Sequence, residues 1–190
     1  MNIAIVVEGP SDRAAYPVLM ERIRTGLRVN QIRDCGGKTK LKNSFVGLLK
    51  ELERNPAWSI ERVFVIQDSD CKPHEEIEAR LQSKLSESHF APEFQVRCFA
   101  TKCVLESWLL ADPRAINTIS RRRGKHKQVE SVQVDLDSYK DAKKLFWEQL
   151  SKAELQAVPP VYAEIASVIE LGQISSRCLS FRRFKEKILA

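Results

Sequence analysis

Three acidic residues, Glu8, Asp68 and Asp70, each follow a run of branched apolar residues that is typical of a strand buried on both faces. Glu8 comes directly after Ile3 to Val7, and Asp68 and Asp70 follow Val63 to Ile66. The carboxyl ends of parallel strands open onto a shared crevice, so we expect these carboxylates to converge there. Oxygen ligands of this kind suit Mg²⁺ or Mn²⁺. The spacing therefore predicts a divalent-metal site, which could activate water and stabilise charge on a phosphoryl group.

The spacing of Asp68 and Asp70 predicts side chains that point the same way, because residues two apart on a strand share a face. The structural alternative for this pair is a turn acid and an N-cap, both of which are common after strands. Asp12 lies one helical turn beyond Glu8 and could help to hold a second metal ion. Its structural alternative is a capping partner that complements the helix dipole.

The elements that must position these residues alternate between strand and helix. Gly9 and Pro10 suit the start of a helix that runs up to Gly26, and the next strand is expected over 29–33. A helix from about 41 to 54 ends before Pro56, and Pro73 begins another after Asp70. A strand at 94–99 and a short helix at 104–110 follow. This order predicts an α/β fold with a mostly parallel sheet flanked by helices.

The second part of the chain has a different pattern. Residues from about 114 to 134 lose apolar periodicity, which predicts a loop or insertion. Helices are expected over 139–150, 161–171 and 180–189. We therefore divide the chain into an α/β core over residues 1–111 and, over 112–190, a basic loop insertion with a C-terminal helical extension packed on the core.

Composition narrows the class of protein. No apolar run approaches the ~20 residues that span a bilayer, and the N-terminus does not resemble a secretory signal, so we expect a cytoplasmic protein without a membrane partner. The five cysteines are scattered without a C-x-x-C pair, which predicts reduced packing residues. The formal net charge of +6 favours polyanionic partners.

Two groups of basic residues could bind the phosphates of DNA or RNA. Lys38 follows the Gly36-Gly37 turn and so could lie near the carboxylates as a phosphate contact. The second group is the predicted insertion, which could contact several phosphates and contains Arg121, Arg122, Arg123, Lys125 and Lys127. The alternative for that segment is a solvated, mobile loop.

Several other chemistries lack support. His74, His89 and His126 have no nucleophile or zinc arrangement around them. The chain has no G-x-x-x-x-G-K-[ST] loop, so nucleotide-dependent control would need a partner ATPase. The single Gly9 in the first turn disfavours a dinucleotide-binding enzyme. The three tryptophans are expected in the core.

The carboxylates and the strands that precede them make the chain resemble the Toprim family of topoisomerases, primases, ribosomal RNA maturases and OLD-type nucleases. The resemblance is carried by Ile3 to Gly9, by Val63 to Asp70 and by the Cys35-Gly36-Gly37-Lys38 turn, and it covers about residues 1 to 111. It implies a Toprim/Rossmann-like fold in which Glu8 is the acid/base carboxylate and Asp68 and Asp70 anchor the metal ion.

Two later stretches, 105–112 and 180–185, are similar to segments of small prokaryotic Toprim-like proteins related to OLD nucleases. That subgroup implies a further metal carboxylate, for which Glu106 is the candidate. Its alternative is a solvated helix residue beside a buried Trp108.

Two functions are compatible with this pattern. The first is a Mg²⁺-dependent nuclease of Toprim/OLD type, acting in nucleic-acid processing or in defence against mobile elements. The second is a non-catalytic Toprim-fold module that binds metal or nucleotide and acts with a partner protein. The sequence leaves the oligomeric state, and the choice between DNA and RNA, open.

Overall fold

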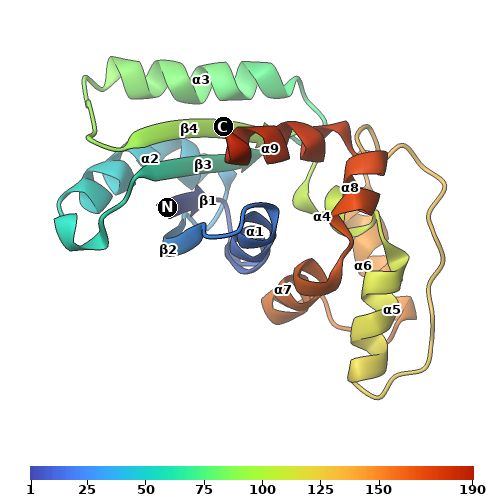
Figure 1. Ribbon diagram of the computed structural model, residues 1–190. Helices are drawn as coiled ribbons and strands as arrows, with labels where there is room; N and C mark the ends of the chain where they lie inside the picture. Colours follow the sequence, from blue (N-terminus) through green and yellow to red (C-terminus); the bar gives the residue numbers. More distant parts are fainter.

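The chain forms one parallel β-sheet in the computed structural model, which describes residues 1–190 (Figure 1). Its strands are β1 (Asn2–Val7), β2 (Arg28–Asp34), β3 (Arg62–Asp68) and β4 (Gln95–Thr101), in the spatial order β2-β1-β3-β4. All neighbouring strands run parallel, so they end at the same edge of the sheet. The predicted α/β class is confirmed, and the two strands with continuous apolar runs are the two central ones.

Side chains of the central strands alternate between two hydrophobic layers, one on each face of the sheet. Helices α2 (Lys38–Glu53) and α3 (His74–Glu87) cover one face, where they bury Ala4, Val6, Val63 and Val65. Helices α1 (Pro10–Ile23) and α9 (Leu179–Leu189) cover the other, where the strands contribute Ile3, Ile5, Val7, Phe64 and Ile66. Figure 1 shows α3 and α1 on opposite sides of the sheet.

The turn from β1 into α1 forms as the sequence predicts. Gly9 is the N-cap in an extended conformation, and Pro10 occupies the first helical position, where its missing N–H would have had no partner. Because this turn contains only Gly9 between Glu8 and the helix, the start of α1 lies at the carboxyl edge of the sheet.

The remaining helices form a lobe beside this edge (Figure 1). They are α4 (Leu105–Leu109), α5 (Pro113–Arg122), α6 (Ala142–Lys152), α7 (Pro159–Val168) and α8 (Leu171–Arg177), and a short 3-10 helix, η1 (Pro56–Trp58), precedes β3. Trp108 is fully buried where the lobe meets the sheet, and its indole N–H donates to Ser180 Oγ at 2.8 Å. One continuous core therefore joins the sheet to the lobe. No helix has both the length and the apolar character needed to cross a membrane.

The loop predicted between about 114 and 134 is wrong for its first part, where the structure has helix α5. Asp112 caps this helix by accepting a hydrogen bond from Arg114 N at 3.1 Å. Its buried face is narrow and consists of Ala115, Ile116, Ile119 and Ser120. These residues recur at helical spacing, so the amphipathic pattern is present in the sequence, and the basic residues that follow it led to the wrong prediction of a loop. Irregular chain begins only beyond Arg123 and leads to α6.

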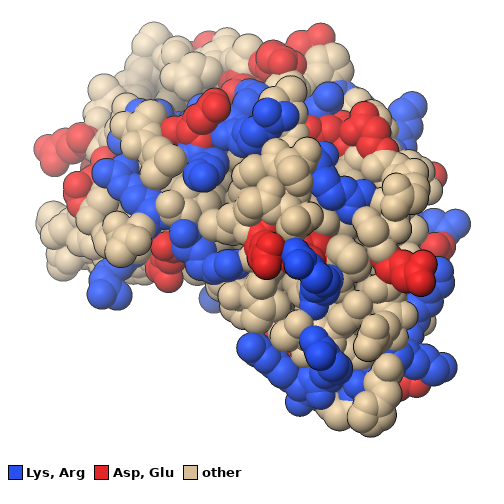
Figure 2. Space-filling model, turned by 45° about the vertical axis from the view of Figure 1, so that its right-hand side comes forward, with Lys and Arg blue, Asp and Glu red and all other residues tan.

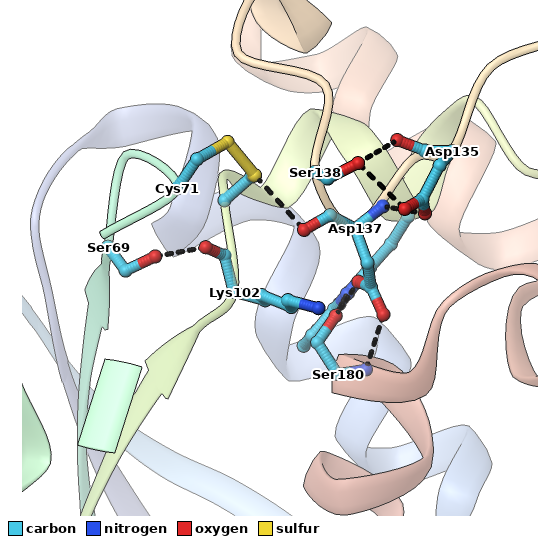
Figure 3. Close-up of a disulfide and its surroundings, with 9 residues drawn as sticks. Ser69, Cys71, Lys102, Asp135, Asp137, Ser138 and Ser180 are labelled. Carbon is cyan, nitrogen blue, oxygen red and sulfur yellow. Dashed lines mark hydrogen bonds between the residues drawn. A yellow bond between two sulfur atoms is a disulfide. The ribbon is translucent and has the colours of Figure 1, made fainter. Parts of the chain in front are cut away.

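The expectation that all cysteines are reduced is also wrong, because Cys71 and Cys103 form a disulfide (Figure 3). These residues lie in the loops after β3 and β4, which are neighbours in the sheet. The same two loops are joined by hydrogen bonds from Asp70 N to Cys103 O at 3.0 Å and from Ser69 Oγ to Lys102 O. Cys35, Cys98 and Cys178 remain free. The disulfide therefore ties the loop that carries Asp70 to the adjacent strand end.

Replacing both Cys71 and Cys103 by serine should lower the free energy of unfolding by about 2–4 kcal/mol, since the bond closes a loop of the unfolded chain. Chemical denaturation with and without dithiothreitol measures this effect. The reductant should destabilise the wild type and leave the double-serine variant unchanged. Equal stability of the oxidised wild type and the variant would contradict a stabilising disulfide.

Candidate metal centre

A polar cavity of about 330 Å³ opens at the carboxyl edge of the sheet. Its lining has no hydrophobic side chain and consists of Glu8, Gly9, Pro10, Ser11, Asp12, Gly36, Gly37, Asp68, Glu106 and Lys143. These residues come from the ends of β1 and β3, the starts of α1 and α2, and the helices α4 and α6. The cavity thus brings together four carboxylates that the sequence analysis selected.

Glu8 and Asp68 are coupled through the backbone of the two central strands. Glu8 Oε1 accepts a hydrogen bond from Asp68 N at 2.8 Å, so the side chain after β1 is fixed to the end of β3. Asp68 Oδ1 accepts from Thr101 Oγ1 at 2.9 Å, and the Thr101 hydroxyl lies 3.1 Å from the buried Tyr16 hydroxyl. Burial raises the pKa of Glu8, and burial together with the negative charge of Asp12 raises the pKa of Asp68 well above its ordinary value.

Asp12 is the capping partner that the structural alternative predicts, and it also lines the cavity. Its Oδ2 accepts a hydrogen bond from Gly9 N at 3.0 Å, which satisfies a free N–H at the start of α1. The same carboxylate lines the cavity. Burial, followed by the negative charges of Glu8 and Glu106, raises the pKa of Asp12 to about 7.

Glu106 lies on α4 and is only 3% exposed, so the solvated alternative for this residue is wrong. Its Oε1 accepts a hydrogen bond from the Tyr162 hydroxyl at 3.0 Å, and Lys143 Nζ lies 3.8 Å from the same oxygen. Sequence reasoning missed Lys143 and Tyr162, because they belong to α6 and α7 and carry no motif that links them to Glu8. Only the folding of the helical lobe over the sheet edge brings them to the site.

Asp70 does not point the same way as Asp68, which corrects the geometry predicted from the D-x-D spacing. Strand β3 ends at Asp68, and Asp70 has a left-handed backbone with a φ of 52°. The alternation of strand side chains therefore stops before Asp70. Its carboxylate is 56% exposed and forms an ion pair with Lys38, the first residue of α2. Asp70 and Lys38 thus stand beside the cavity and do not form its wall.

The Gly36-Gly37 turn brings backbone, without side chains, to the cavity wall. Both residues have positive φ angles, 69° for Gly36 and 128° for Gly37, and residues other than glycine rarely adopt such backbone conformations. Gly37 N donates to Glu8 O at 2.7 Å, which fixes the turn to the end of β1. Helices α1 and α2 consequently both begin at the cavity, and helix N-termini carry partial positive charge that favours anions such as phosphate.

The donor set suits a hard divalent cation. Glu8, Asp12, Asp68 and Glu106 each have one oxygen held by a hydrogen bond within the protein, while the second oxygen has no protein donor. Oxygen-only ligand sets of this kind fit Mg²⁺ or Mn²⁺. The side chains are not gathered around one point, since no three acidic, histidine or cysteine groups stand close enough to form a ready ligand set. Coordination therefore requires side-chain rotation.

The basic segment from Arg121 to Lys127 lies elsewhere. It begins at the end of α5, the end that points away from the sheet in Figure 1, and Figure 2 shows Lys and Arg gathered on this lower part of the molecule. Arg123 pairs with Glu164 at 2.6 Å, and Lys127 lies 3.6 Å from Glu154. The structure does not bring this segment into the cavity.

The pKa of Asp12 predicts a pH-dependent effect of the substitution Asp12→Asn in metal-free buffer. An aspartate whose folded pKa of about 7 exceeds its ordinary 3.8 stabilises the fold at low pH and loses that contribution between about pH 4 and pH 7. Relative to the variant, the wild type should therefore lose up to about 1.4 kcal/mol of unfolding free energy per pH unit across this window. Chemical denaturation at several pH values measures the difference.

Asparagine can still accept the hydrogen bond from Gly9, so the cap is preserved in this comparison. The matched control is Asp141→Asn, which removes a carboxylate at an exposed residue outside the cavity. A difference between the wild type and Asp12→Asn that does not change with pH would contradict the raised pKa.

Comparison with known proteins gives a family but not an activity. No curated protein matches the chain. A solved structure described as the C-terminal region of the Burkholderia pseudomallei OLD protein is similar, with 14% sequence identity, a TM-score of 0.46, and coverage of 97% of this chain and 95% of that chain. The model of the family described as "Domain of unknown function (DUF4276)" matches residues 7–189, a range that includes every residue of the cavity. The chain therefore belongs to the DUF4276 family.

Proposed function

We propose that this protein is a Mg²⁺- or Mn²⁺-dependent nuclease that cleaves phosphodiester bonds of nucleic acid. The observation that carries the proposal is the convergence of Glu8, Asp12, Asp68 and Glu106 on one cavity without hydrophobic lining. Four carboxylates from different elements serve no packing purpose at a partly buried site, and their mutual repulsion disfavours the fold in the absence of a cation. A purely structural role does not explain this cost.

The oxygen donors present fit a divalent cation in their chemistry, and after side-chain rotation Glu8, Asp12, Asp68 and Glu106 would hold it, with Asp70 available at the rim. A divalent ion at this position supplies a lowered pKa for a bound water and stabilisation of phosphoryl charge. Hydrogen bonds from neighbouring groups orient three of these carboxylates. Asp68 N donates to Glu8, the Thr101 hydroxyl donates to Asp68, and the Tyr162 hydroxyl donates to Glu106. Each of these contacts holds one carboxylate oxygen and leaves the other free to turn toward a cation.

Other groups at the cavity suit a phosphate. The N-termini of α1 and α2 present backbone N–H groups, and Lys143 supplies a cation in the cavity wall. Lys38 lies at the rim in its ion pair with Asp70 and could exchange that partner for a phosphate oxygen. Glu8 Oε2 has no protein donor, and the raised pKa of Glu8 suits a group that takes up a proton.

The Toprim resemblance of residues 1–111 supports the same chemistry, since it implies that Glu8 is the acid/base residue and that Asp68 and Asp70 are metal anchors. A role in nucleic-acid processing or in defence against mobile elements belongs to this proposal. Any control by nucleotide hydrolysis would require a partner ATPase, because the chain has no phosphate-binding loop of the G-x-x-x-x-G-K-[ST] type.

The substitution Asp68→Asn should reduce metal-dependent cleavage by roughly 100-fold or more while the fold is retained, because it removes a charged ligand but keeps an oxygen for Thr101. The assay uses single-stranded and double-stranded DNA and RNA with Mg²⁺ or Mn²⁺. Asp141→Asn is the matched control and should cleave like the wild type.

Two results would contradict the nuclease. Cleavage that persists in Asp68→Asn, or in the presence of a chelator, would place the activity outside this cavity. Metal-dependent nucleic-acid or nucleotide binding without cleavage by the wild type would instead favour the non-catalytic module acting with a partner protein.

The basic segment gives a separate prediction about affinity. Arg121 and Lys125 are exposed and have no ion-pair partner, whereas Arg123 is paired with Glu164. Reversal of charge at Arg121 and Lys125 should weaken binding to all sequences and reduce the slope of log affinity against log salt by about one to two. Measurement of the dissociation constant over a range of salt concentrations tests this. An unchanged slope would show that the segment is a solvated loop and not a phosphate contact.

A further inference from the structure

Trp147 contradicts the expectation that the tryptophans are core residues. It is 47% exposed on α6, whereas Trp108 is completely buried. The ring is nevertheless held in place, because its Nε1–H donates to the Tyr162 hydroxyl at 3.0 Å. Exposure of a large aromatic ring costs hydrophobic free energy, and a fixed ring at the surface is the form in which aromatic residues recognise ligands.

Trp147 is connected to the candidate metal centre on two sides. The Tyr162 hydroxyl that accepts from its indole also donates to Glu106 Oε1 at 3.0 Å, and Glu106 lines the cavity. Lys143, one helical turn earlier on α6, also lines the cavity, and its Nζ lies over the Trp147 ring at 5.5 Å from the centroid. The Trp147 ring is thus linked to the cavity by a hydrogen-bond chain through Tyr162 and by the contact with Lys143, although it does not itself line the cavity.

We propose that Trp147 is a stacking platform for an unpaired nucleobase, which makes single-stranded nucleic acid the substrate class of this site. The inference rests on the proposed function, since a phosphate in the cavity beside Lys143 would place an adjoining base near the ring. Proteins that bind single strands combine cationic groups along the backbone with aromatic rings that take successive bases. Bases within a duplex are stacked on both faces and cannot use such a ring.

A positioning role must be separated from stacking, because Trp147 also contacts Glu106 through Tyr162. Two variants separate them. Trp147→Phe retains an aromatic ring but loses the N–H donor, whereas Trp147→Leu loses both. A stacking platform tolerates the first change much better than the second, while a hydrogen-bonded positioning residue is damaged by both.

Trp58 provides a matched control. It is also partly exposed, and Arg33 lies over its ring at 5.3 Å from the centroid, so its surroundings resemble those of Trp147. It belongs to η1, directly before β3, and therefore lies toward the amino end of the strands, away from the cavity. Trp58→Leu should leave nucleic-acid binding unchanged.

The experiment measures the dissociation constants of a short single-stranded oligonucleotide, as DNA and as RNA, and of an abasic strand of the same length. Ca²⁺ replaces Mg²⁺, and gel analysis verifies that the strands stay intact. Trp147→Leu should weaken binding of the base-bearing strand by about 5-fold to 100-fold, as expected for the loss of one stacked base. Trp147→Phe should bind nearly as the wild type does, and all variants should bind the abasic strand equally.

The outcomes distinguish this inference from the proposed function. Wild-type binding that Trp147→Leu leaves unchanged, or weakens equally for the abasic strand, would overturn stacking and leave the nuclease proposal standing. Equal losses in Trp147→Phe and Trp147→Leu would assign Trp147 to positioning and would also overturn stacking. Failure of the wild type to bind any strand would overturn both proposals.

Discussion

The electrostatic cost of holding several carboxylates together in a partly buried cavity is the constraint on which the rest of this structure depends. Burial and mutual repulsion raise the pKa values of Glu8, Asp12 and Asp68, so each of these groups binds a proton more readily than it would in water. Either protons or a cation can relieve the repulsion. The hydrogen bonds around the cavity hold one oxygen of each carboxylate and leave the other without a protein donor, and the side chains would have to rotate before three of them could share one cation.

A hydrogen bond and a disulfide link neighbouring strand ends at the edge of the sheet where the carboxylates lie. The bond from Asp68 N to Glu8 joins the ends of the two central strands, and the Cys71–Cys103 disulfide joins the loops after β3 and β4. The helical lobe closes the site from the other side and contributes Glu106 and Lys143. Its position is fixed by the buried Trp108 and its bond to Ser180. Distant parts of the chain are therefore needed to complete a cavity whose first carboxylate is Glu8.

Much of the fold could be predicted from the sequence, because the central strands are continuous apolar runs and the Gly9-Pro10 turn specifies the start of α1. The place of Glu8 and Asp68 at the carboxyl ends of those strands could be predicted for the same reason. The rest depended on contacts between distant segments or on local backbone geometry. Asp70 turned away because the strand ends at Asp68, and the disulfide joins loops that are neighbours only in the folded sheet. Helix α5 was missed although its apolar residues recur at helical spacing, because the basic run after it was interpreted as part of a loop. Lys143, Trp147 and Tyr162 carry no motif at all.

Thermal unfolding as a function of Mg²⁺ or Mn²⁺ concentration tests most directly whether the acidic cavity binds a divalent cation. Any ligand that binds the folded state alone raises its stability by mass action. The midpoint of the wild type, and of Asp141→Asn, should rise with metal concentration, whereas that of Asp68→Asn should rise much less. No metal-dependent rise in the wild type, or an equal rise in all three proteins, would contradict a metal centre formed by Glu8, Asp12, Asp68 and Glu106.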